Sequence, residues 1–205
     1  MDEVHEFCRR VLGAGAAADE AALEARESTG AGRVEMLGAA GRACRARAAQ
    51  RSSEGAADAE PPGAPAGLLE AVSLELAQAN ARLPERQREA LALRELLRLS
   101  YDQISKVIGI EGAALAPLLA RARLRLRAQR RGVALPGGSD CGERDRALRV
   151  LARRQDSEPL SGEDDLWLLE HLGVCAQCSQ AHAAMLEASA CYRAWPAGPV
   201  WTAGQ

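Results

Sequence analysis

Two stretches that cannot continue a helix divide this sequence into three helical segments. Residues 52–67 gather proline and glycine and lose hydrophobic periodicity, and Leu135-Pro136-Gly137-Gly138 forms a second break. Proline lacks the amide hydrogen that a helix interior needs, and glycine is costly to hold in a helix. The predicted divisions are a module at 1–51, a linker at 52–67, a module at 68–131, a linker at 132–140, a module at 141–195 and a tail at 196–205.

The composition predicts an all-α fold made of three small helical modules. Alanine, leucine, arginine and glutamate dominate, whereas aromatic residues make up only 3% of the chain. The abundant residues favour helices, and the β-branched and aromatic residues typical of strands are scarce. Small helical modules with few aromatic residues have thin cores. They usually need a metal ion, a partner or a neighbouring domain for stability.

Charge and hydropathy restrict how the chain can bind nucleic acid and in which cellular compartment we expect it. Its net charge of −2 means that any nucleic-acid binding must rest on a local basic patch. The first residues show no basic segment followed by an apolar one, and no window approaches eighteen apolar residues. We therefore expect a cytoplasmic protein without a membrane span. In that compartment six cysteines indicate thiols or metal ligands rather than disulfides.

The residues from Leu83 to Arg131 carry the signals of a helix-turn-helix. Pro84 suits the first turn of a helix, and Ser100 with Gln103 three residues later forms a capping-box pattern. Gly109 supplies the left-handed turn that ends the short helix. A longer helix follows with leucine on one stripe. The alternative is a generic helical bundle, because capped helices with glycine stops are common. Two short helices joined through glycine are also the arrangement of a helix-turn-helix, so the spacing alone leaves both interpretations open.

This stretch resembles region 4 of sigma factors of the extracytoplasmic-function group, a helix-turn-helix of the winged-helix-like superfamily. The resemblance implies a role in bacterial transcription initiation, with core RNA polymerase and promoter DNA as partners. The residues that fit the family's pattern are Leu83, Pro84, Arg88, Leu99, Ser100, Tyr101, Ile104, Gly109, Ile110 and Arg121-Ala122-Arg123.

The second helix departs from that family at the positions that would read DNA. Ala116, Pro117 and Leu118 stand where polar and basic side chains are expected. Base edges are read by hydrogen bonds, which these side chains cannot make. The arginines that follow can bind phosphates without sequence preference, or they form a solvated or acid-paired helix end. The candidate DNA-binding residues are Arg121, Arg123, Arg125, Arg127 and Arg130.

The N-terminal module resembles sigma region 2 over about a dozen positions. The matching segments are residues 7–13, which end in Leu-Gly, and the acidic residues 18–24. In that family the following segment stacks aromatic side chains on unpaired bases, but residues 33–51 contain no aromatic residue. We therefore interpret the module as a degenerate region 2. Cys8 and Cys44 are interpreted as small packing residues.

Four residues of the C-terminal module form a zinc-ligand pattern. Structural zinc takes four cysteine and histidine ligands, and the spacing His-x3-Cys-x2-Cys places three of them at a helix end and the following turn. The fourth ligand is Cys141, with His182 as the alternative. The other possibility is that the cysteines pack without metal. The predicted set for one structural zinc ion is Cys141, His171, Cys175 and Cys178.

The pattern resembles the zinc-containing anti-sigma domain, in which an acidic turn and a capped helix precede His-x3-Cys-x2-Cys. The resemblance implies a sigma-factor-like regulator carrying an anti-sigma-type domain in cis, in contact with its own helix-turn-helix. The alternative function is an interaction module that binds a sigma factor or polymerase without reading promoter sequence. No nucleophile, histidine and acid set and no phosphate loop is evident, so we do not expect an enzyme.

Overall fold

Every regular element in the described part of the chain is a helix, which confirms the all-α prediction. The structure is a computed structural model that describes residues 2–27, 32–53, 68–133 and 141–196. The expected linkers and tail lie almost wholly in 54–67, 134–140 and 197–205, outside the described residues. No helix within these ranges is long and apolar enough to cross a membrane.

The N-terminal segment forms three helices around Phe7, the single phenylalanine of the chain, which is completely buried. The side chain of Asp2 accepts a hydrogen bond from the Val4 amide at 3.2 Å and starts the first helix. Cys8 and Cys44 are also fully buried, as packing residues should be. The helices are α1 (Glu3–Leu12), α2 (Ala16–Glu27) and α3 (Arg33–Ser53).

The central segment contains the helix-turn-helix. The Ser100 side chain accepts from the Gln103 amide, and the Gln103 side chain accepts from the Ser100 amide, so the predicted capping box is present. Gly109 ends that helix in the left-handed conformation, with φ of 71°. The helices are α4 (Leu68–Ala81), α5 (Glu85–Leu91), η1 (Ala92–Leu96), α6 (Tyr101–Ile108) and α7 (Gly112–Arg131).

The turn η1 is a π-helix that the sequence pattern does not predict. It continues α5 directly and is followed by Arg98, which adopts a positive φ of 56°. A π turn adds one residue to a helical turn and therefore rotates the side chains that follow. The turn η1 contains Glu95, an acid that is only 3% exposed. The unusual backbone thus occurs where a carboxylate enters the core.

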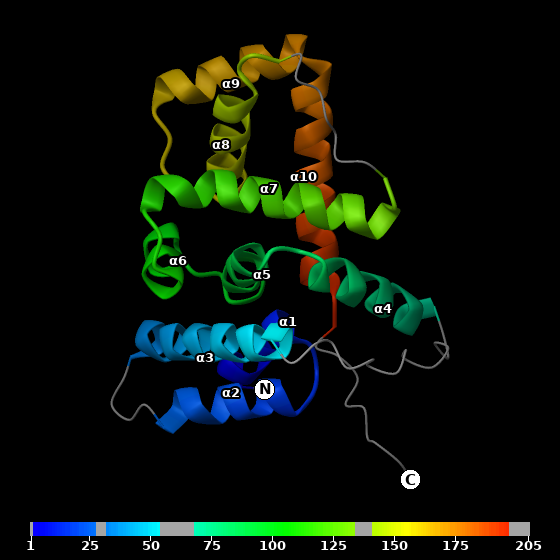
Figure 1. Ribbon diagram of the computed structural model, residues 1–205. Helices are drawn as coiled ribbons and strands as arrows, with labels where there is room; N and C mark the ends of the chain where they lie inside the picture. The colour runs from blue at the N-terminus through cyan, green and yellow to red at the C-terminus, as the bar shows by residue number, and fades with distance from the viewer. Residues whose placement is uncertain (1, 28–31, 54–67, 134–140, 197–205) are drawn as a thin grey trace.

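The C-terminal segment forms three helices, of which α8 and α9 lie on the opposite side of α7 from α5 and α6, while α10 crosses α7 (Figure 1). The longest of them runs past α7 and ends beside α1, where the Trp195 carbonyl accepts from Arg10. One continuous core therefore extends from Val4 through Leu91 to Tyr192, and the three segments share it. The helices are α8 (Arg144–Gln155), α9 (Gly162–Val174) and α10 (Ala176–Ala194).

Replacing the cap of α6 tests this description of the helix-turn-helix. We expect Ser100→Ala to lower the free energy of unfolding by about 1 kcal/mol, because the Gln103 amide at the helix start loses its acceptor. Ser100→Thr keeps the hydroxyl and should retain most of the stability. Urea unfolding followed by circular dichroism measures both. Equal stability of the two variants would contradict the assigned cap.

Candidate metal centre and the buried surface of the recognition helix

The four predicted metal ligands come from four positions around α8, α9 and α10 in the C-terminal segment. Cys141 precedes α8, His171 lies in the last turn of α9, Cys175 joins α9 to α10 and Cys178 lies in the first turn of α10. Ser161 caps the start of α9 by accepting from the Asp164 amide at 3.0 Å. The capped helix and the tight junction at Cys175 therefore place three of the ligands side by side.

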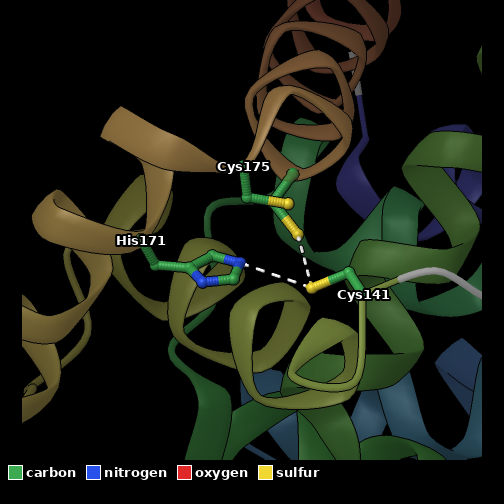
Figure 2. A group of neighbouring side chains, drawn as sticks. Cys141, His171 and Cys175 are labelled. Carbon is green, nitrogen blue, oxygen red and sulfur yellow. Dashed lines mark hydrogen bonds between the residues drawn. The ribbon is translucent and has the colours of Figure 1, made fainter.

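The ligand atoms of these four residues all lie within 4.8 Å of one another. His171 Nε2 is 3.5 Å from Cys141 Sγ (Figure 2). Cys178 Sγ is 3.7 Å from Cys141 Sγ. A tetrahedral zinc with bonds of about 2.3 Å to sulfur and about 2.0 Å to nitrogen gives sulfur–sulfur and sulfur–nitrogen separations of about 3.8 and 3.5 Å. The donor set and its spacing therefore fit a tetrahedral metal, and Cys141 rather than His182 completes it.

Neighbouring side chains hold the imidazole of His171 in place. The ring of Trp167 stacks on it with centroids 5.0 Å apart, and the guanidinium of Arg146 lies 4.1 Å from the centroid of that indole. Arg146 also donates to Asp164 at 2.9 Å, and this hydrogen bond lowers the pKa of the Asp164 carboxyl. Such outer contacts orient a ligand before metal binds.

The cysteines differ in how readily they ionise. The Cys178 amide donates to the sulfur of Cys175 and lowers the pKa of the Cys175 thiol. Burial raises the pKa of the Cys178 thiol to about 12. Thiolate is the form that ligates metal. Cys178 therefore favours the neutral thiol until a cation offsets its burial.

At the other end of the C-terminal segment, a buried ion network joins it to the helix-turn-helix. The Arg123 guanidinium donates to Glu95 Oε1 at 2.7 Å and makes two bonds to the Asp156 carboxylate at 2.6 and 3.0 Å. The Arg123 side chain is 0% exposed. Burial opposes its charge, but the carboxylates of Asp156 and Glu95 outweigh that effect and raise the pKa of Arg123.

Further hydrogen bonds satisfy the remaining oxygens of these two acids. The Tyr101 hydroxyl donates to Asp156 Oδ2 at 2.8 Å. The Ser189 hydroxyl and the Arg193 guanidinium donate to the two oxygens of Glu95 at 2.7 and 2.9 Å. Buried carboxylates are tolerated when their lone pairs are occupied in this way. The network thus joins η1, α6 and α7 to the end of α8 and to α10.

The network corrects the expectation that Arg123 contacts DNA, because in this structure the side chain cannot reach a phosphate. A sequence signal for its burial exists. Arg123 follows Ala116 by seven residues and Ala120 by three, and both of these alanines lie on the buried face of α7. Asp156 and Glu95 carry no comparable signal, because their partners are distant in sequence.

The other candidate arginines differ in their surroundings. Arg121 is exposed and lies 3.5 Å from Asp145, whereas Arg127 donates to Glu187 at 2.8 Å. Arg130 contacts the sulfur of Cys191. Arg125 is half-buried and has no ion-pair partner among the described residues. Their proposed contacts with phosphate stay predictions.

Helix α7 is buried on two sides. Leu115, Leu119 and Leu126 are at most 1% exposed, and the helix packs against α4, α5 and α6 on one side and α8 on the other, with α10 crossing it (Figure 1). Pro117 lies in the second turn, where its missing amide leaves the carbonyl of the exposed Ala113 to water. The helix that would enter a major groove is therefore covered on two sides, while its first three residues and Arg121 stay exposed.

The comparisons with known proteins agree with the central segment. Residues 73–126 match the family described as Sigma-70, region 4. Neither a curated protein nor a solved structure matches the chain. The chain therefore contains a domain of the sigma-70 region 4 type, and this domain supports a sigma-factor-like role in transcription with DNA and polymerase contact. The resemblances of the first and last segments to region 2 and to anti-sigma domains stay predictions.

Two arginines separated by one residue test the buried network. We expect Arg123→Leu to destabilise the protein by about 3 kcal/mol, because Glu95 and Asp156 lose the buried guanidinium that bridges them and keep only Arg193 and Arg94 as counter-charges. Arg121→Leu removes an exposed pair and should change stability by less than about 0.5 kcal/mol. Urea unfolding measures both. If Arg123→Leu prevents folding, Arg123→Lys is measured instead. Lysine keeps the charge but lacks the planar guanidinium, so this variant should lose less stability than Arg123→Leu and more than Arg121→Leu. Equal effects of the substitutions at the two sites would refute the network's role.

Proposed function

We propose that the chain is a sigma-factor-like regulator of bacterial transcription initiation whose region-4-type helix-turn-helix is covered in cis by its C-terminal zinc module. In this role the chain acts beside core RNA polymerase in the cytoplasm and needs no catalytic site. The observation that carries the proposal is the double burial of α7. A helix that reads DNA must present one face to the groove.

The ion pairs between α7 and the C-terminal segment support the proposal that this segment is a removable cover on the helix-turn-helix. Arg123 meets Asp156, and Arg127 and Arg131 both donate to Glu187 of α10. These are cationic groups of a helix-turn-helix paired with carboxylates from another segment of the chain. Phosphates would compete for the same guanidinium groups at the exposed end. A cover tethered by a short linker acts at high effective concentration and needs little intrinsic affinity.

We further propose that Cys141, His171, Cys175 and Cys178 hold one structural zinc ion. Bound zinc would supply a fixed tetrahedral junction between the start of α8, the end of α9 and the start of α10. The four protein ligands leave no open coordination position, as in structural rather than catalytic sites. The arrangement is similar to that implied for anti-sigma zinc domains, which supports a regulatory role for the module.

Metal analysis of two cysteine variants tests the zinc proposal. The wild type and Cys191→Ser, which removes a thiol outside the cluster, should each contain one zinc ion per chain. Cys141→Ser should lose most of its zinc and become less stable, because metal binding contributes directly to folding. Purification in reducing buffer followed by elemental analysis gives the ratio. A folded wild type without zinc would refute the site.

A second function has its own support. Between Gly112 and Ala120, helix α7 has no side chain that donates or accepts a hydrogen bond. A helix without such groups cannot discriminate base pairs directly. The second candidate is therefore an interaction module that binds polymerase or a sigma factor and does not read promoter sequence.

Loosening the cover separates the two functions. Glu187→Lys places a third positive charge beside Arg127 and Arg131 and should release the end of α10 from α7. Glu170→Lys makes the same charge change on an exposed position of α9 and serves as the control. Each protein is tested for capture of core polymerase and for binding to a promoter library at several salt concentrations.

A regulator covered in cis predicts stronger DNA binding by Glu187→Lys than by Glu170→Lys, with a steep salt dependence and a preferred sequence. Polymerase capture without sequence preference in any variant would favour the interaction module. If none of the proteins captures polymerase or binds DNA, both functions are wrong.

A further inference from the structure

A largely apolar cavity lies where the three segments of the chain meet. Its volume is about 460 Å³, and its walls come from the end of α1, the outer face of α4, Arg88 of α5 and Trp195 after α10. Val11, Leu12, Leu74 and Ala77 supply apolar surface. Pockets that bind small ligands have volumes of roughly 300–1,000 Å³ and mostly apolar walls with a few polar groups. The cavity has these properties and is separate from the metal cluster and from the covered face of α7.

The charged groups around the cavity are not balanced. Three guanidinium groups line it, against the two carboxylates of Glu6 and Glu70. Arg10 is paired through two of its nitrogens, since Nε donates to Glu6 at 2.9 Å and Nη2 to the Trp195 carbonyl at 2.8 Å, and its guanidinium lies 3.8 Å from the Trp195 ring centroid. Its third nitrogen, Nη1, is buried without a hydrogen-bond partner among the described residues. The role of Arg10 is to join α1 to the end of α10. Glu70 has an interaction of its own.

The other two guanidinium groups, of Arg9 and Arg88, have no carboxylate within ion-pair distance in the part of the chain that the structure describes. The hydrogen bond that Arg88 makes there is to the Ala81 carbonyl at 2.8 Å. Burial lowers the pKa of Arg88, which shows that water solvates its charge incompletely. A cation withdrawn from water beside an apolar wall favours an anionic partner.

We infer that this cavity binds a small amphipathic anion, with its acidic group at Arg88 and Arg9 and its apolar part between α1 and α4. The chemical class is a carboxylate with an aliphatic or aromatic body. This inference is independent of the proposed function, because it requires neither zinc nor DNA. A ligand in this position contacts all three segments and therefore stabilises their packed arrangement, by an amount that grows with the logarithm of its free concentration above the Kd.

Binding of decanoate to the full-length protein tests the inference. Isothermal titration calorimetry should show saturable binding, and the Tm should rise with decanoate concentration. Decanol has the same chain without the charge and should bind about tenfold more weakly or not at all. If decanoate gives neither a binding heat nor a Tm shift, the inference is overturned; this is the result expected if another part of the chain fills the cavity. Equal binding of decanol overturns the assignment of an anionic ligand.

Two variants locate the site. Arg88→Gln should weaken decanoate binding about tenfold, whereas Arg82→Gln, an exposed arginine that does not line the cavity, should leave it unchanged. Ala77→Trp should block binding by filling the cavity, and circular dichroism checks that it folds. If Ala77→Trp does not fold, the comparison of Arg88→Gln with Arg82→Gln locates the site by itself. Unchanged binding in Arg88→Gln, or equal losses in both arginine variants, overturns the site.

Discussion

The bridging of Glu95 and Asp156 by Arg123 is the interaction on which the arrangement of this protein depends. Each of the three groups comes from a different part of the fold, η1, α7 and the end of α8, and all three are removed from water. A buried charge without its partner costs several kcal/mol, so the three elements are stable together only in this register. The helix-turn-helix and the C-terminal segment therefore form one structural unit.

This network and the metal cluster hold opposite ends of the same helices. Asp156 follows α8 and Cys141 precedes it, while Ser189 lies near the end of α10 and Cys178 near its start. A metal bound by the four ligands would fix the outer ends of α8 and α10 and thereby the positions in which their inner ends meet α7. Under the proposed function, metal occupancy would therefore act on α7 through two helices rather than through direct contact.

Local features of the fold could be predicted from the sequence because their causes lie within a few residues. The capping box at Ser100 and Gln103 and the left-handed turn at Gly109 depend on neighbours three or four positions away. The ligand cluster was predictable for a related reason, since His171, Cys175 and Cys178 are close in sequence and their chemistry leaves few alternatives. The π turn at 92–96 was not predicted, because its sequence also suits an ordinary α-helix and tertiary packing selects the wider turn.

The sequence by itself determined that the chain is helical, where the short helix α6 begins and ends, and which four residues can gather around a metal ion. Only the tertiary structure decided that Arg123 is an internal ion-pair residue, whereas Arg121 two positions earlier faces solvent. The physical reason is that an arginine's role depends on what surrounds it. The carboxylates that enclose Arg123 lie 28 and 33 residues away along the chain. No local pattern specifies such a meeting, because it results from the packing of helices on both sides of α7.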